Sequence, residues 1–460
     1  MNNEKRPTPR YQPTPRRVSS AGQARSQRAS SADRAQSRRP ETRNAQSQRP
    51  QARSAQPRRT ATQRSAPQGP KPTQKGFPLV AGAIAAVAVI AVVVGIGIPA
   101  IGGLFSSQDA AESKTVVSFV AVGDNLPDDY IGWYADRLAG DEDDGLYDYS
   151  PIFEPIVPYI QGADLAYINQ ETHLGGDDIG PQGYPSFNTT DAMATTVVDS
   201  GFDFVASASN HSYDWGQGAL AHSVDLWEKM PVAFTGTALT EEQYDRIVTQ
   251  ERNGITFALL NYTYGVNAYS QDTLPAYAVN FIDDDRIRAD VQRAHEVADV
   301  VLVSMHWGTE LLTEADDEQQ RLAQLLADLD VDVVLGSHPH VIGPMAWVEN
   351  SSNPDHRTLV AYSLGNFLAD HEAPLADNVL EGMLTCDFVR YEEGGPVTVE
   401  NVRWIPLVCH SDEDRSSFAV YAVDDYPAEM AKQCRALSDI DDPISWLYEQ
   451  THSIVGEQWF

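Results

Sequence analysis

Two histidines separated by one proline stand directly after a mostly apolar run, Val331–Leu335, that is typical of a buried strand. His338 and His340 occupy a turn of small residues, and open α/β sheets bind their ligands beyond the carboxyl ends of such strands. Neutral imidazole is the commonest metal ligand in proteins, so this spacing indicates a metal site. A turn whose histidines cap backbone carbonyls is the alternative that this segment alone leaves open.

Four further apolar segments end in a side chain that can bind a metal ion. The candidate ligands are therefore Asp124, Glu171, Asn210, His306, His338 and His340, with His211 next to Asn210. Each has an ordinary structural explanation by itself, but five strands ending alike would need five coincidences. Mixed carboxylate, amide and imidazole donors predict one or two divalent ions, Mn, Zn or Fe, and disfavour calcium and thiolate zinc sites. A carboxylate that bridges two ions about 3.5–4 Å apart suits phosphoester hydrolysis.

Strands and helices alternate along residues 116–367, which predicts a largely parallel sheet covered on both faces. The expected strands are 116–122, 164–168, 202–206, 255–261, 300–305, 331–335 and 359–363. Helices are expected between them at 151–160, 191–199, 218–229 and 285–297, and around the apolar stripe formed by Leu322, Leu325, Leu326 and Leu329. From residue 383 the pattern changes to a hairpin, 383–389 and 397–408, followed by a helix at 426–438 and a surface tail.

The amino-terminal part differs in charge from the remainder. Residues 1–75 carry 18 Lys and Arg against three acids, whereas residues 76–460 carry 15 against 62. Residues 1–75 hold almost no large apolar side chains, so we expect a disordered basic tail. Nucleic acid is not expected as its partner, because Tyr11 is its one aromatic residue for stacking.

A transmembrane signal anchor is expected at 76–105. Residues 77–105 hold no charged side chain and exceed the roughly 20 apolar residues that span a bilayer. A cleaved signal peptide would not normally lie behind 75 residues. The positive-inside rule then predicts a single-pass protein of the cell membrane with a cytoplasmic N-terminus, a linker at 106–115 and an extracellular domain.

Residues from about Val116 to Val408 resemble the bacterial capsule-synthesis family (CapA type, linked to poly-gamma-glutamate production). The matching motifs are 122–124, 164–171, 187–188, 201–205, 209–216, 262–265, 306–308, 336–341 and 362–367. The resemblance implies an α/β fold, a four-layer α/β/β/α sandwich of the metallophosphatase-like kind, at residues 116–410. A helical or irregular extension would follow at 411–460.

Comparison with metallophosphatases implies a role for each candidate. Glu171 would bridge two ions, with Asn210, His306 and His338 on the second ion and His340 and Asp124 on the first. His211, oriented by Asp214, would be the acid that protonates the leaving oxygen. One departure matters: Leu126 stands where the Asp-x-His pattern has its histidine, so the first ion lacks a ligand unless Asp128 or another group supplies it.

Two functions stay open at this point. One is a metal-dependent surface hydrolase that acts on a phosphoester or an amide, and the retained histidines favour it. The other is a non-catalytic accessory of capsule or poly-gamma-glutamate biosynthesis that binds a polymer, and Leu126 favours it. The expected partners are the membrane, other capsule or polyglutamate synthesis membrane proteins, and an anionic polymer or phosphoester substrate. The acidic domain would repel such a polyanion unless bound ions reversed the local charge.

Overall fold

The computed structural model describes residues 114–140, 144–371 and 375–460. The predicted tail at 1–75, the predicted anchor at 76–105 and most of the predicted linker lie outside these described residues. Within the three described stretches, every helix falls short of the length and apolar character that crossing a bilayer requires.

The larger sheet combines a parallel half with an antiparallel half. Its order is β14-β13-β12-β1-β2-β3-β4, with β11 beside β1. The strands β1 to β4 are parallel to one another, whereas β12, β13 and β14 form an antiparallel meander that joins β1. The bounds are β1 (Thr115–Leu126), β2 (Leu165–Gln170), β3 (Phe204–Ala206), β4 (Ala233–Thr235), β11 (Asn366–Ala369), β12 (Leu380–Arg390), β13 (Val397–Ser411) and β14 (Phe418–Ala422). The hairpin predicted at 383–408 is therefore part of the same sheet as the first strand.

The smaller sheet has the order β5-β6-β7-β8-β10-β9. The strands β6, β7, β8 and β10 are parallel, and the edge strands β5 and β9 are antiparallel to their neighbours. The bounds are β5 (Val248–Arg252), β6 (Ile255–Thr263), β7 (Val300–His306), β8 (Val333–Ser337), β9 (Met345–Glu349) and β10 (Arg357–Ala361). Every residue of β7 and β8 is buried, which explains why these strands read as apolar runs without alternation.

Helices follow the parallel strands, as the alternating pattern predicts. Their bounds are α1 (Asp129–Ala139), α2 (Ser150–Phe153), α3 (Val157–Ile160), α4 (Ala192–Ser200), α5 (Gly216–Trp227), α6 (Glu241–Asp245), α7 (Asp284–His295), α8 (Asp317–Ala327), α9 (Ala428–Ala431) and α10 (Pro443–Val455). The single helix expected at 151–160 is two short helices, because Pro155 and Pro158 interrupt it. The start of α8 is fixed by a capping box between Asp316 and Gln319.

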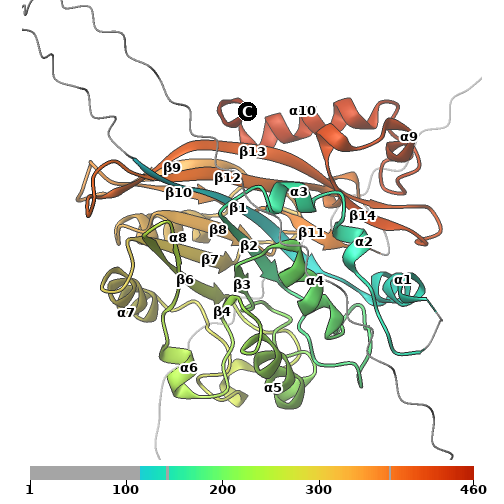
Figure 1. Cartoon of the computed structure of the whole chain (residues 1–460), viewed down its shortest axis with the longest axis horizontal. Coiled ribbons are helices and arrows are strands. Elements are labelled where there is room, and N and C mark those ends of the chain that lie inside the picture. Colours follow the sequence, from blue (N-terminus) through green and yellow to red (C-terminus); the bar gives the residue numbers. More distant parts are fainter. Residues whose placement is uncertain (1–113, 141–143, 372–374) are drawn as a thin grey trace, which may run out of the picture. The chain divides into compact units, whose positions relative to one another are not determined.

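Three buried apolar clusters separate the layers of the fold. The intersheet core contains inward side chains of both sheets, such as Phe119 of β1 and Phe257 of β6. Val120, on the other face of β1, belongs to a second cluster with α1 to α5, and a third cluster joins the smaller sheet to α7 and α8. Helices therefore cover the outer face of each sheet (Figure 1), and the mixed α/β class predicted from the sequence is confirmed.

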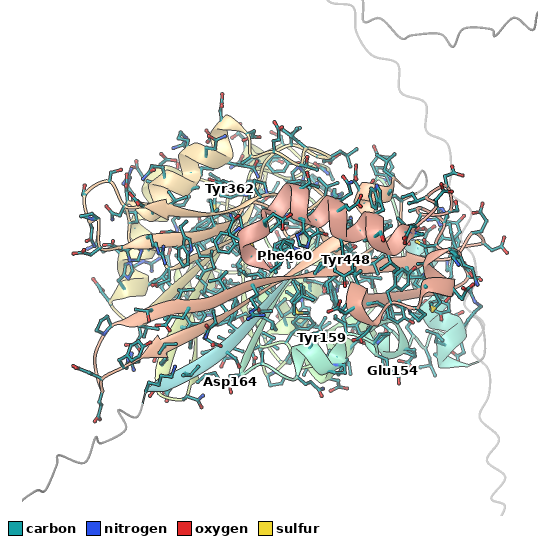
Figure 2. The ribbon with its side chains drawn as sticks, turned by 90° about the horizontal axis from the view of Figure 1, so that it is seen from above. Glu154, Tyr159, Asp164, Tyr362, Tyr448 and Phe460 are labelled. Atoms are coloured by element: carbon teal, nitrogen blue, oxygen red, sulfur yellow. The ribbon has the colours of Figure 1, made fainter. Side chains whose placement is uncertain are left out.

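The carboxyl-terminal residues were predicted wrongly. The helix expected at 426–438 is reduced to the four residues of α9. The tail expected at the surface forms α10, the helix that carries the labelled Tyr448 and lies across the sheet, with Phe460 at the end of the chain (Figure 2). Leu447 and Val455 of α10 are buried in the intersheet core. The apolar stripe was missed because Thr451 interrupts it; its hydroxyl donates to the carbonyl of Leu447 at 2.7 Å and so is tolerated inside.

Candidate metal centre

The predicted ligands meet where parallel strands of both sheets end. Asp124 lies near the end of β1 and Glu171 follows β2 directly. Asn210 and His211 are in the turn after β3, His306 is the last residue of β7, and His338 and His340 are in the turn after β8. All of these side chains are buried. The structure thus brings together residues that are up to 216 positions apart in the sequence, in one place at the junction of the sheets.

Glycines allow the strands to approach closely at this junction. A Cβ atom on Gly123 would lie 1.9 Å from the carbonyl oxygen of Gly365, and one on Gly336 would lie 2.1 Å from that of Tyr362. The amide of Asp124 donates to Gly365 at 3.0 Å. A side chain at either glycine would therefore separate the strands and move the candidate ligands next to them.

The turn with the two histidines has an unusual backbone. His338 has a φ of 95° and His340 a φ of 58°, in the left-handed region that non-glycine residues rarely adopt. The turn is held by the amide of His338, which donates to Asp124 Oδ2 at 2.9 Å, and by the amide of Leu311, which donates to the carbonyl of Pro339 at 2.8 Å. These bonds tie the turn to β1 and to the loop after β7.

Glu171 is the central group of the site. Both of its carboxylate oxygens are buried and have no hydrogen-bond partner among the described residues. Its Oε1 lies 3.6 Å from Nε2 of His306 and 3.8 Å from Nε2 of His340. Burial and the nearby Asp124 carboxylate raise the pKa of Glu171 well above its usual range. A buried carboxylate without partners is costly, and a bound cation would offset that cost.

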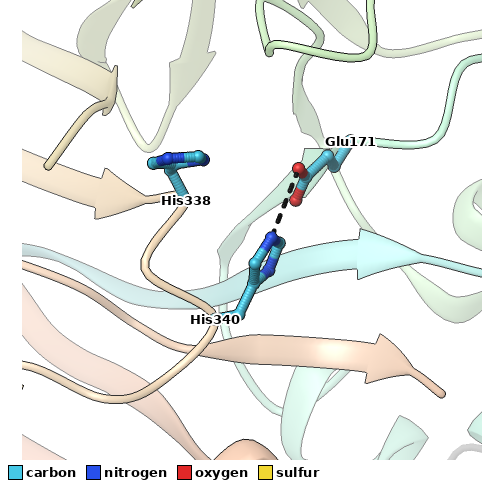
Figure 3. Close-up of side chains that lie close together, drawn as sticks. All are labelled: Glu171, His338 and His340. Atoms are coloured by element: carbon cyan, nitrogen blue, oxygen red, sulfur yellow. Dashed lines mark ion pairs between the residues drawn. The ribbon is translucent and has the colours of Figure 1, made fainter. Parts of the chain in front are cut away.

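Two overlapping groups of side chains could each hold an ion. Their potential ligand atoms lie within 4.8 Å of one another, in the sets Glu171, His338, His340 and Asp124, Glu171, His306. Glu171 belongs to both sets, and its carboxylate faces the imidazole of His340, with His338 nearby (Figure 3). Asn210 Oδ1, 2.7 Å from His306 Nε2, adds an amide oxygen to the second set. The donor set is therefore of a kind that can hold a divalent ion.

The imidazoles are suited to act as neutral ligands. Burial lowers the pKa of His306 and His340 well below the usual value and that of His338 to about 4. The Nδ1 atom of His338 is buried and has no hydrogen-bond partner in the described part of the chain. Burial also raises the pKa of Asp124 to about 7. A bound cation would lower this pKa, because it stabilises the ionised carboxylate.

His211 and Asp214 form a hydrogen-bonded pair beside these groups. His211 Nδ1 lies 2.7 Å from Asp214 Oδ2, which also accepts from the amide of Phe187 at 2.8 Å. The Phe187 ring packs edge-on against the imidazole at 4.7 Å. Because a carboxylate only accepts, Nδ1 of His211 is the protonated nitrogen, as the spacing of these two residues allowed.

Asp128 does not replace the ligand that Leu126 lacks. Its carboxylate accepts from the amide of Ile131 at 3.0 Å, capping α1, and pairs with Arg415 at 3.0 Å. Leu126 itself packs in a small apolar cluster with Phe187 and Ala369. The suggestion that Asp128 serves the first ion is therefore wrong, because capping and the ion pair hold it elsewhere.

Sequence reasoning missed several groups that support the ligands. Asn169 donates to Asp124 Oδ1 at 2.7 Å, and Ser337 Oγ lies 2.9 Å from His306 Nδ1. Asn366 contacts the imidazole of His340. The half-exposed ring of Tyr264 lies 4.7 Å from that of His338. Each of these residues lies within one of the motifs at 164–171, 262–265, 336–341 and 362–367. The motifs therefore included these residues, but they did not indicate what each side chain does.

Comparison with known proteins identifies relatives of this chain. A family model described as "Bacterial capsule synthesis protein PGA_cap" matches residues 118–371. The "PGA biosynthesis protein CapA" of Bacillus subtilis (strain 168) is 26% identical over 267 residues, which cover 56% of this chain and 64% of the relative. The "Capsule biosynthesis protein CapA" of Bacillus anthracis is 24% identical over 229 residues, covering 48% and 54%. The matched region thus spans less than two thirds of either relative.

Solved structures also match the chain. A novel phosphatase of Mycoplasma pneumoniae shares 12% identity, covers 64% of this chain and 94% of its own, and has a TM-score of 0.38. The NAD nucleotidase of Haemophilus influenzae shares 12% identity, covers 74% and 60%, and has a TM-score of 0.38. Both TM-scores are below 0.5, so nothing about the chemistry of this chain rests on them.

Proposed function

Because this chain belongs to the bacterial capsule synthesis protein family, we propose that it is a metal-dependent hydrolase of capsule or poly-gamma-glutamate biosynthesis. The substrate would be a phosphoester or an amide of the capsule polymer or its precursor. The observation that carries the proposal is Glu171, an unpartnered buried carboxylate between two imidazoles at the junction of two sheets. A metallophosphatase-like, four-layer arrangement is the fold that this site would use.

The residues that would hold one or two ions are Asp124, Glu171, Asn210, His306, His338 and His340, with Glu171 shared by both candidate groups. Mn, Zn or Fe would suit these mixed oxygen and nitrogen donors. Such ions, when bound, polarise the reacting bond and activate water for attack. His211, protonated on both ring nitrogens, would give the Nε2 proton to the leaving group and keep the Nδ1 proton, while Asp214, which accepts from Nδ1–H, would orient the ring and stabilise its charged form.

The charge pattern of the chain supports a need for ions. Lys and Arg are absent from residues 115–136, 138–228, 253–285, 294–320, 322–356 and 358–389, which include every strand end of the site. Arg415 lies outside these ranges in the sequence, and its guanidinium is paired with Asp128 and Asp370. An anionic substrate would therefore depend on bound divalent ions for positive charge. Without ions, the buried carboxylates would repel it.

A non-catalytic accessory that binds the polymer is the second candidate. Leu126 favours it, because a site without the Asp-x-His histidine holds the first ion with fewer ligands. The two candidates differ in one respect that can be measured: a binding accessory needs neither the acid His211 nor its partner Asp214.

We further propose a location at the cell surface. The uncharged run at 77–105 and the basic residues before it support a single-pass anchor with the domain outside. Other membrane proteins of capsule or polyglutamate synthesis would then be its partners. Protease treatment of intact cells is the test: degradation of the domain with protection of residues 1–75 is expected, and full protection would contradict this topology.

Metal content and turnover test the hydrolase. The full chain, purified in detergent, is expected to retain one or two transition ions and to cleave a member of a panel of phosphoesters and glutamyl amides. His211→Gln should keep the metal and lower the turnover, by about 10²–10⁴-fold for a lost general acid. Metal binding without turnover in any variant would support the accessory. A wild-type chain that binds neither Mn²⁺ nor Zn²⁺ would refute both the site and the proposed hydrolase.

A further inference from the structure

Asn366 is a buried amide at the start of β11, opposite Asp124 in the ladder between β1 and β11. Its Nδ2 lies 3.2 Å from the carbonyl oxygen of His340 and 3.1 Å from that of Asn378. The same nitrogen lies 3.3 Å from Nε2 of His371. Its Oδ1 lies 2.9 Å from Nδ1 of His340. One amide thus contacts both the backbone and the ring of a candidate ligand.

The contacts of Asn366 determine which way its amide faces. Carbonyl oxygens can only accept hydrogen bonds, so the NH₂ group of Asn366 must be the side that faces His340 O and Asn378 O. The other side is then the oxygen, which can only accept from His340 Nδ1. That ring nitrogen must therefore carry a proton. The nearest competing acceptor, Asp124 Oδ2, is 3.6 Å from Nδ1, beyond hydrogen-bond distance.

A neutral imidazole has a single N–H, so a proton on Nδ1 leaves a lone pair on Nε2. A histidine that binds a metal ion does so as the neutral imidazole. The Nε2 atom faces Glu171 Oε1 at 3.8 Å. Two acceptors then face each other in a buried site, and this is an arrangement that a cation satisfies.

We propose that Asn366 is a positioning residue that fixes His340 as the Nδ1–H tautomer and makes Nε2 its metal-binding atom. This inference rests on the proposed metal site and assigns a role to the motif at 362–367. Hydrogen bonding of the second ring nitrogen orients metal-binding histidines in general, and its loss weakens metal binding by about 10- to 100-fold.

Asn378 provides a matched control. Its side-chain Nδ2 donates to the carbonyl oxygen of His340 at 3.3 Å and is also buried, but within the described part of the chain it makes no hydrogen bond to the ring. Asn378→Ala therefore removes a hydrogen bond to the same residue without touching the imidazole. Asn366→Leu keeps the branched shape of the side chain and removes both the acceptor and the donor, whereas Asn366→Asp keeps an acceptor for Nδ1 and removes the donor.

The experiment measures the Kd of the full chain for Zn²⁺ and Mn²⁺ by chelator competition, with thermal unfolding of the metal-free protein as a check on folding. Asn366→Ala and Asn366→Leu should raise the Kd by about 10- to 100-fold, while Asn366→Asp and Asn378→Ala stay close to wild type. If Asn366→Ala fails to fold, Asn366→Leu decides.

Three outcomes have distinct meanings. Unchanged affinity in Asn366→Leu would overturn the role of Asn366 and leave the metal site standing. Equal losses in Asn366→Leu and Asn366→Asp would also overturn it, because the donor side would then be what matters. Absence of Zn²⁺ and Mn²⁺ binding in the wild type would instead remove the proposed metal site itself.

Discussion

Replacing Glu171 with glutamine is expected to have opposite effects on stability with and without metal. Both oxygens of Glu171 are buried and lack a hydrogen-bond partner among the described residues, and burial raises the pKa of Glu171 well above its usual range. Glutamine has nearly the same shape and no charge. Without metal, the variant should therefore be more stable than the wild type. With metal, it should be less stable, because the group shared by both candidate ion sites is gone.

The size of each effect can be worked out from these contacts. Glutamine is still a buried polar group, but it avoids the extra cost of burying a carboxylate, so the variant should raise the free energy of unfolding by about 1–3 kcal/mol at pH 8. A metal at a hundred times its Kd stabilises the wild type by about 2.7 kcal/mol, and the variant should lose most of this. For a domain of this size, about 2 °C of melting temperature corresponds to 1 kcal/mol.

Thermal unfolding in EDTA and in excess Zn²⁺ or Mn²⁺ is the assay, and Glu381→Gln is the control. Glu381 of β12 is also fully buried, both its oxygens lack a hydrogen-bond partner within the described chain, and burial raises its pKa. It belongs to neither candidate ion group. Glu381→Gln should therefore stabilise the chain in both buffers by a similar amount. Only Glu171→Gln should be more stable than the wild type in EDTA and less stable than the wild type when metal is added.

Two results would refute this reasoning. If Glu171→Gln lowers stability in EDTA, the carboxylate has a stabilising partner within the protein and does not need a cation. If Glu171→Gln and Glu381→Gln respond alike to added metal, ions do not bind through Glu171, and the two-group description of the site fails.

His338→Ala and His340→Ala should each lower the metal content measured by elemental analysis while the circular dichroism spectrum stays that of the wild type; unchanged metal content would remove these histidines from the site. The metal-free chain should lose stability as the pH rises from about 4 through about 7, because the pKa of Asp124 is raised from 3.8 to about 7 and the folded state holds the proton longer. The full shift amounts to about 4 kcal/mol by pH 8, of which about 3 kcal/mol falls between pH 5 and pH 8, and denaturant unfolding in EDTA at these two pH values would measure that part; a flat profile would contradict the shift. Leu447→Ala should lower the free energy of unfolding by about 2–5 kcal/mol, because the side chain is buried under β13, while Glu449→Ala on the exposed face should change it little; equal effects would show that α10 does not contribute to the core.

The parallel strands and the meeting of their ends could be predicted from sequence because both depend on local pattern. Buried strands such as β7 are mostly apolar, and a residue that ends or follows one must lie at the carboxyl edge of the sheet. This rule by itself puts His306 and His338 at one edge. It does not determine which atoms approach Glu171, since that depends on strand twist and on packing between the two sheets.

Contacts between distant segments account for most of what the sequence did not reveal. Asp128 looked available as a ligand, yet it pairs with Arg415, 287 residues later in the chain. Asn366 looked like one more residue of a motif, and its role depends on contacts with His340 and Asn378. The burial of α10 was hidden for a different reason: Thr451 interrupts the apolar stripe and hides its helical period.

The left-handed turn at His338 and His340 has a consequence for how this protein would change over time. A non-glycine residue in such a conformation costs about 1–3 kcal/mol, and glycine would relieve it. Stability alone would therefore favour glycine at both positions, and only selection for the chemical role of the two imidazoles opposes that change. In a descendant that no longer used the metal, random substitution should remove these two histidines before it disturbs the buried strands on either side. The presence of both histidines would thus indicate that the site still binds a metal.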